Sequence, residues 1–124
     1  MRVFVTKEFG RFARTQNIAD AKLCEAVQRA EDGLIDADLG DGVIKQRVAR
    51  AGQGRRGGFR TLIAYRRGKR AVFIHGFAKK DRDNIQRDEE SQLKMLAAAA
   101  LSLEEELVHV ALETNKWREV ACDG

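Results

Sequence analysis

Three runs of strand-forming residues follow one another in the middle of the chain, and they constrain its fold more than any other feature. The runs are VIKQRVA at 43–49, FRTLIAYRR at 59–67 and AVFIHGFA at 71–78. The link between the second and third runs has the length of a hairpin turn, and its Gly68 can supply a positive φ. Because strands joined by short connections pair in antiparallel fashion, we predict a small antiparallel sheet.

Other segments with strand and helix patterns precede these runs. VFVT at 3–6 predicts a short strand, and Thr6 can cap a short helix that follows it. Apolar residues recur at helical spacing from 17 to 30, which predicts an amphipathic helix. The glycine-rich segment at 31–42 predicts turns.

Two more helices are predicted after the third run. The first begins near Asp88, where acidic residues suit a helix N-terminus, and continues through the alanines at 97–100. SLEE at 102–105 has the form of a capping box and predicts the start of the second. Its expected apolar stripe is Leu103, Leu107, Val110 and Ala111. The segment KWREV at 116–120 is either a final strand or a tail, and the whole order predicts one α+β domain over residues 1–124.

Alternation along the strands assigns side chains to faces. Lys45 and Arg47 are expected to share one face of the first run, while Ile44 and Val48 point toward a core. Arg60 is expected on the face opposite its neighbours in the second run, as an exposed side chain. Basic side chains on several strands together predict a basic sheet surface.

Charge is strongly polarised along the chain. Residues 43–82 contain thirteen lysines or arginines and one acidic residue, whereas the rest of the chain contains ten basic and eighteen acidic residues. A block of net charge +12 favours a polyanionic partner, such as a nucleic acid, through counterion release and steering. The segment GQGRRGG at 52–58 leads into a strand rather than a helix, which excludes a Walker loop and a Rossmann fingerprint.

The sequence gives little support for a metal site, a cofactor site or a Ser-His-Asp or Cys-His catalytic arrangement. His75 is expected to be a satisfied core histidine or a semi-buried one on its strand, and His109 has no nearby partner in the sequence. Cys24 and Cys122 lie almost a full chain apart and match no metal spacing, so we expect free thiols in a reducing cytoplasm. The chain begins without the pattern of a signal peptide and contains no apolar run long enough to span a membrane.

The segment DGVIKQRVARAGQGRRGGFRTLIAYRRGKRAVFIHGFAKKDRDNI, residues 41–85, resembles the RelE-like toxins of bacterial type II toxin–antitoxin systems. It is nearest the branch with the pattern I-K-x-R-x-A-R-x-G-x-G-[KR]-x-G-G-[FY]-R-T, followed by G-F-A-K-[KN] and N-I. The resemblance implies the RelE/ParE-like toxin fold, a cognate antitoxin, and cleavage of messenger RNA on the ribosome. In that reaction the RNA 2′-hydroxyl attacks the adjacent phosphate, without a cofactor.

The resemblance also implies roles for individual residues. Arg60 would stabilise the phosphorane, and Lys45 or Arg47 would contact the 2′-hydroxyl and its phosphate, although only the lysine could act as a base. Lys79 or Lys80 would stabilise or protonate the leaving 5′-oxygen. The expected RNA-binding residues are Arg50, Arg55, Arg56 and Arg82. Well-known members carry a tyrosine, or a histidine with a carboxylate, after the last main strand, where this chain has Gln86.

Two other functions remain open from the sequence. ParE-like toxins share the fold and inhibit DNA gyrase without cleaving RNA, and a basic sheet can also belong to a non-enzymatic RNA-binding module. An antitoxin could cover the basic block with an acidic face, or bind elsewhere and block ribosome entry sterically, and we predict the first. The acidic helices at 88–113 are expected to pack on the far side of the sheet.

Overall fold

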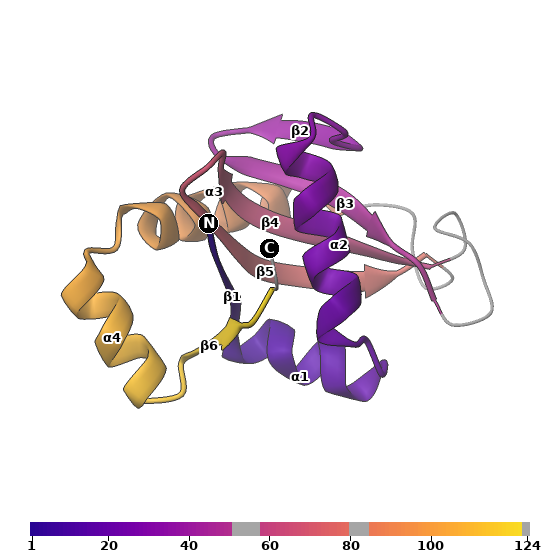
Figure 1. Cartoon of the computed structure of the whole chain (residues 1–124). Coiled ribbons are helices and arrows are strands. Elements are labelled where there is room, and N and C mark those ends of the chain that lie inside the picture. The colour runs from indigo at the N-terminus through magenta and orange to yellow at the C-terminus, as the bar shows by residue number, and fades with distance from the viewer. Residues whose placement is uncertain (51–57, 80–84, 123–124) are drawn as a thin grey trace.

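The computed structural model describes residues 1–50, 58–79 and 85–122, in which a single sheet carries helices on both faces (Figure 1). In chain order the elements are β1 (Arg2–Thr6), α1 (Lys7–Thr15), α2 (Asp20–Glu31), β2 (Ala37–Gly40), β3 (Val43–Val48), β4 (Phe59–Arg66), β5 (Arg70–Ala78), α3 (Arg87–Ser102), α4 (Glu105–Glu113) and β6 (Trp117–Val120). The α+β prediction and the three central strands are therefore confirmed. No helix of this described part is long and apolar enough to cross a membrane.

The sheet has the strand order β2-β3-β4-β5-β1-β6. Strands β2 to β5 form an antiparallel meander, and the β4–β5 hairpin turns at Gly68, whose φ is +70°. The N-terminal strand β1 runs parallel to β5, and β6 pairs with β1 in antiparallel fashion. The segment at 116–120 is therefore a strand rather than a tail.

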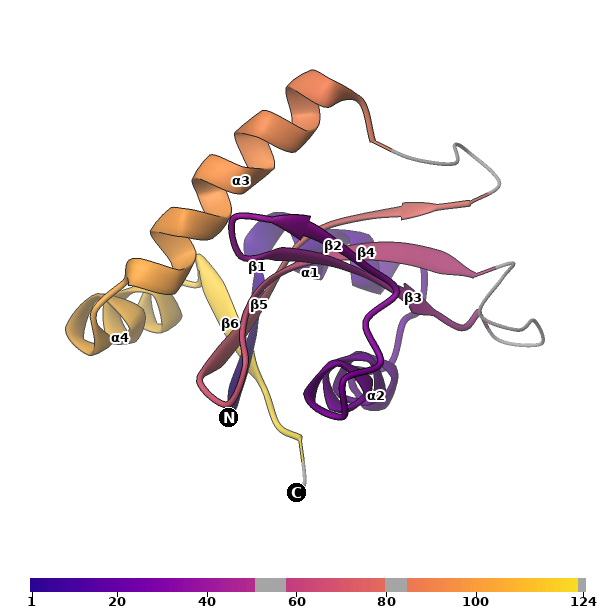
Figure 2. The ribbon, with the colours of Figure 1, turned by 90° about the horizontal axis from the view of Figure 1, so that it is seen from above.

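Two apolar clusters cover the two faces of the sheet. Helices α1 and α2 pack on one face through Phe9 and Leu23, and α3 packs on the other through Ala97 and Leu101. Figure 2 shows α3 on one side of the sheet and α2 on the other. Because both faces are covered, β4 is buried from Phe59 to Ala64, including positions that alternation alone would leave in solvent.

Local signals placed some helix ends correctly and others wrongly. Thr6 caps α1 as predicted, since its side chain accepts a hydrogen bond from the Phe9 amide at 3.1 Å. The predicted capping box at 102–105 is wrong, because Ser102 still belongs to the last turn of α3 and Glu104 is the cap of α4. A capping box occurs instead at the start of α3, between Gln86 and Glu89.

Two further expectations about the outer segments are corrected. The turn-rich region contains the short strand β2, which pairs with β3 at the edge of the sheet. Cys24 and Cys122 form a disulfide rather than two free thiols. The chain leaves β6 beside α2, so the two Cα atoms lie 5.5 Å apart despite 98 residues of sequence separation, within the range that a disulfide needs.

Candidate nucleic-acid interface

The basic block of the sequence divides into two groups at opposite ends of the sheet. At the β4–β5 hairpin, Arg67 donates to the Glu31 carbonyl at 3.0 Å, and Arg70 donates to the Ala100 and Leu103 carbonyls at 2.9 and 2.8 Å. These arginines satisfy carbonyls at the C-terminal ends of α2 and α3, where positive charge is also favourable. This group therefore has a structural role, and it leaves the other end of the sheet as the candidate site.

The candidate site lies where β3 ends and β4 begins, on the face that carries α3. In the β3–β4 pairing Lys45 is opposite Leu62 and Arg47 is opposite Arg60. Lys79 follows β5 directly, and its amide donates to the Gly58 carbonyl at 3.3 Å, which keeps it beside the start of β4. The tertiary structure thus brings together Lys45, Arg47, Arg60 and Lys79, which we name the cationic face.

Arg60 is buried, which corrects the expectation that it is exposed. Its exposed fraction is 6%, whereas the Arg47 and Lys79 side chains are exposed and Lys45 is partly buried. The cause is its position in the central strand β4, between Arg47 of β3 and Phe77 of β5 in the register. A buried guanidinium in a protein interior has a stronger electrostatic effect on a nearby phosphate than an exposed one.

The backbone amide and the backbone carbonyl of Arg47 are both held by side-chain hydrogen bonds. Its amide donates to the Asp36 carboxylate at 2.7 Å, and its carbonyl accepts a hydrogen bond from the Arg29 guanidinium. The neighbouring Gln46 is fully buried and bonded through both ends of its amide, to the Ala26 carbonyl at 3.0 Å and the Asp36 amide at 2.7 Å. These bonds hold β3 on α2 and so position the exposed Arg47 side chain.

The end of β3 also carries one of the predicted RNA-binding residues. Arg50 lies over the Phe59 ring, with its guanidinium carbon 5.4 Å from the ring centroid. Gly58 has to be glycine, because a Cβ there would come within 2.1 Å of the Val48 carbonyl oxygen. The remaining predicted site residues, Arg55, Arg56, Lys80 and Arg82, lie outside the described residues.

A β-bulge in β5 adds a residue that the sequence alone did not assign to the site. The register shifts between Leu62 and Ile63, so two residues of β5, Ile74 and His75, face α3 in succession. Strict alternation would place His75 with Phe73 on the α1–α2 face, but instead His75 Nε2 lies 3.9 Å from the Glu89 carboxylate of α3. Bulges that reorient a side chain are common beside active sites. No local sequence signal marks this one.

The acidic helix lies on the same face as the cationic residues, not on the far side as expected. The reason is the apolar face of α3, because Ala97 and Leu101 pack with Val43 and Leu62. The N-terminal turn of α3 consequently brings Glu89 next to the cationic face. In the described part of the chain, no group of histidine, cysteine, aspartate and glutamate side chains could hold a metal ion.

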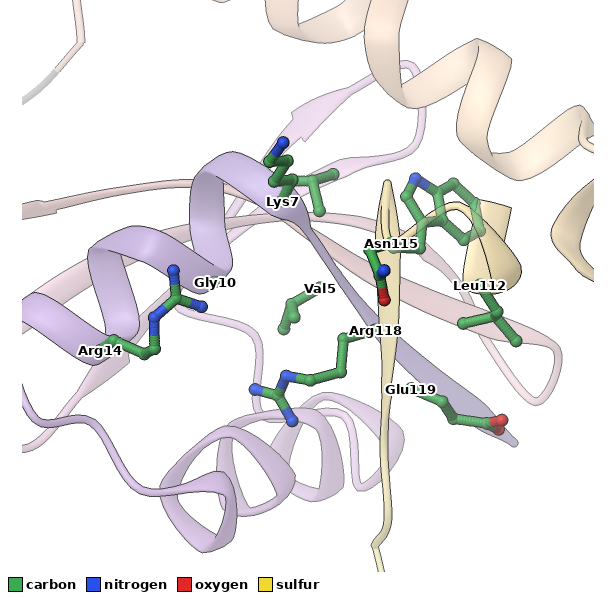
Figure 3. A pocket seen from close by; sticks show the side chains of 10 residues that line it. Val5, Lys7, Gly10, Arg14, Leu112, Asn115, Arg118 and Glu119 are labelled. Carbon is green, nitrogen blue, oxygen red and sulfur yellow. The ribbon is translucent and has the colours of Figure 1, made fainter. Parts of the chain in front are cut away.

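Two other concave surfaces are separate from the cationic face. One lies between α1 and β6 and is lined by Arg14 and Arg118, as Figure 3 shows. Arg118 is held there by two hydrogen bonds to Asp20, at 3.0 and 3.1 Å, so an acidic partner already offsets its charge.

The other concave surface is a groove of about 350 Å³ between α3 and α4. Leu107 and Val110, predicted as part of a buried stripe, are half exposed along it, while Val108 takes the buried position of that helix. His109 of the same helix does have a nearby partner, because its Nε2 lies 2.7 Å from the Glu113 carboxylate.

A mixed sheet between helical layers, with arginine and lysine side chains gathered at one end, defines a small α+β protein with a cationic face. The family model described as the RelE toxin of the RelE/RelB toxin–antitoxin system matches residues 1–120. The chain therefore belongs to the RelE toxin family and is a toxin of a toxin–antitoxin system, with a RelB-type antitoxin as its partner. No curated protein and no solved structure gives a significant match.

Proposed function

We propose that this toxin inhibits translation by cleaving messenger RNA on the ribosome. The observation that carries the proposal is the meeting on one face of Lys45 and Arg47 of β3, Arg60 of β4 and Lys79, which directly follows β5. Such a cluster attracts an RNA backbone and stabilises the extra negative charge of a pentavalent phosphorane. Membership of the RelE family gives independent support for a toxin that acts in this way.

In the proposed reaction, side chains of this chain act directly on the ribosome-bound RNA. The 2′-oxygen forms a bond to the adjacent phosphorus while the bond from phosphorus to the 5′-oxygen breaks, which gives a 2′,3′-cyclic phosphate and a 5′-hydroxyl. Arg60 neutralises charge on the phosphorane, Lys45 and Arg47 hold the attacked phosphate, and Lys79 or Lys80 donates toward the leaving 5′-oxygen. Arg50 and, outside the described residues, Arg55, Arg56 and Arg82 contact the flanking phosphates.

A non-enzymatic RNA-binding role has less support from the structure. Single-stranded RNA is usually bound by stacking its bases on exposed aromatic rings. In the described part of the basic block, Phe59, Phe73 and Phe77 are all buried, and Tyr65 donates its hydroxyl proton to Glu31. These rings stabilise the core rather than offer a stacking surface.

Brief induction of the toxin without its antitoxin tests the proposal. We expect translation to stop before growth does, and primer extension on a translated message to reveal new 5′ ends inside codons. The matched control is the same message with its start codon removed, which should stay intact if cleavage needs the ribosome. Intact messages together with early loss of DNA supercoiling would favour the gyrase-inhibiting alternative instead.

The proposed site of action is the cytoplasm, where messages are translated. The redox state of Cys24 and Cys122 can be compared with this proposed location, because disulfides are rare in a reducing compartment such as the cytoplasm. Alkylation of the thiols in intact cells, before lysis, should show the two cysteines unmodified if the bond is present where the toxin acts.

A further inference from the structure

His75 lies on the same side of the sheet as the cationic face, which the alternation of its own strand does not predict. The bulge in β5 places it opposite Leu62, which is itself opposite Lys45, so the three residues form one row across the sheet. Arg60 and Phe77 belong to the adjacent row, and the rings of His75 and Phe77 lie 6.1 Å apart. His75 therefore lies in the row next to that of the proposed phosphorane-binding arginine, and in the same row as Lys45, the proposed 2′-hydroxyl contact two strands away.

Glu89 approaches the same imidazole from the opposite layer. Its carboxylate lies 3.9 Å from His75 Nε2, and the two side chains are 35% and 30% exposed, so water and RNA can reach the pair. The backbone of α3 fixes Glu89, since its side chain also accepts a hydrogen bond from the Gln86 amide at 3.2 Å. A carboxylate this close favours the protonated imidazole by its charge, which suits His75 to accept a proton.

We infer that His75 is the general base of the cleavage reaction and that Glu89 is its positioning residue. This inference rests on the proposed function. Among the described residues of this face, His75 is the side chain whose ordinary pKa, about 6.5, lies near neutral pH, whereas lysine and arginine ordinarily stay protonated there. The inference places the base within the last main strand and does not require the missing tyrosine or histidine near Gln86.

The proton balance of the step is simple. Neutral His75 accepts the proton of the 2′-hydroxyl as the bond from the 2′-oxygen to phosphorus forms. The bond from phosphorus to the 5′-oxygen breaks, and the 5′-oxygen takes a proton from Lys79. The resulting imidazolium is stabilised by the Glu89 carboxylate and returns its proton to water, while the lysine regains one.

The charges around His75 act in opposite directions. Lys45 and Arg47 of β3, Arg60 of β4 and Lys79 beyond β5 all favour the neutral imidazole, which is the form that a base requires. Glu89 of α3 favours the imidazolium formed in the reaction. Glu90, next to it, is held by Lys94 at 3.3 Å. Removing the Glu89 charge should therefore lower the pH at which His75 titrates.

Multiple-turnover cleavage of ribosome-bound message, measured over ranges of message concentration and pH, tests the inference. His75→Gln is expected to slow kcat by about 100-fold or more, with little change in KM, and to abolish the rise of rate with pH that the wild type shows. Glu89→Gln should slow kcat by about 10-fold and move that rise to lower pH. His109→Gln is the matched control, because His109 also pairs with a glutamate but is exposed on α4, and it should behave as the wild type.

A second measurement keeps structural damage apart from catalysis. The imidazole resonances of His75 should titrate at lower pH in Glu89→Gln than in the wild type. The variant should also remain folded and still bind a message that carries a 2′-deoxy residue at the cleavage position and so cannot be cleaved. If the wild type cleaves and His75→Gln keeps its rate and pH profile, the inference is wrong while the proposed function stands. If the wild type does not cleave ribosome-bound message, the proposed function itself fails.

Discussion

Arg60 lies directly opposite Arg47 in the antiparallel pairing of β3 and β4. Like charges at directly opposed positions of a sheet repel each other. An RNA phosphate between the two guanidinium groups would relieve this repulsion. We therefore expect the Arg47–Arg60 pair to favour binding of an RNA phosphate while lowering the stability of the free protein.

Arg60→Met should remove cleavage without unfolding the protein. Methionine keeps most of the side-chain volume and eliminates a buried charge, so the free energy of unfolding should stay within about 1.5 kcal/mol of the wild type. Urea denaturation and cleavage of ribosome-bound message are the two measurements. Arg66→Met, an exposed arginine at the other end of the same strand, is the control and should keep cleavage. A loss of stability comparable to a core mutation would show that Arg60 is mainly structural.

The double variant Arg55→Ala/Arg56→Ala should weaken ribosome or RNA binding without removing chemistry at saturation. Each lost phosphate contact should reduce the slope of log affinity against log salt concentration by about one. The control is Arg66→Ala/Lys69→Ala, which makes the same change of charge at the exposed hairpin end of the sheet. A slope equal to that of the wild type would show that Arg55 and Arg56 make no phosphate contact.

Association with the antitoxin should become slower as salt increases. An acidic partner is steered toward the cationic face, and salt screens that attraction. Stopped-flow mixing at low and high salt, with the wild type and with Arg47→Ala, gives the comparison. A rate indifferent to salt, together with loss of binding in Leu107→Asp, would instead place the antitoxin in the apolar groove between α3 and α4.

Tyr65→Phe should change the response of stability to pH at both extremes. The Tyr65 hydroxyl donates to Glu31 and lowers the pKa of that carboxyl below its ordinary value, while burial and Glu31 raise the pKa of Tyr65. The Glu31 contribution is therefore present above pH of about 4.3 and is lost as pH falls through its depressed folded pKa. The Tyr65 contribution is present below pH of about 10 and is lost as pH rises through its raised folded pKa.

Urea unfolding at several pH values measures this difference. At neutral pH the free energy of unfolding of the phenylalanine variant should be lower by about 1 kcal/mol. The loss is small for a hydrogen bond to a charged group because solvent screens the partly exposed Glu31 carboxylate. The gap should close in acid below the ordinary glutamate pKa. A gap that stays constant from pH 7 to pH 3 would show that the effect comes from packing rather than from the hydrogen bond.

Reduction of the Cys24–Cys122 disulfide should lower the free energy of unfolding by about 2 to 4 kcal/mol. The bond closes a loop of nearly the whole chain, so it restricts the unfolded state strongly. The comparison is urea denaturation with and without reductant, and Cys24→Ser/Cys122→Ser should be insensitive to reductant. Equal midpoints for the oxidised and reduced wild type would contradict this expectation.

The sequence by itself determined the elements whose signals are local. The three central strands, the hairpin at Gly68 and the helix α2 follow from alternation, turn chemistry and helical spacing within a few residues. The segment from 41 to 85 was also sufficient to indicate the RelE family, because its glycines and basic residues occur in a long specific order.

Only the tertiary structure decided which of these residues meet. Arg60 is buried because the central strand has neighbours on both edges and a helix over its face, which no property of the strand's own sequence reveals. The Cys24–Cys122 disulfide depends on β6 returning beside α2 after almost the whole chain has been traversed. His75 reaches Glu89 because one extra residue in β5 moves it to the other face, and alternation cannot predict an irregularity that is set by pairing with a neighbouring strand.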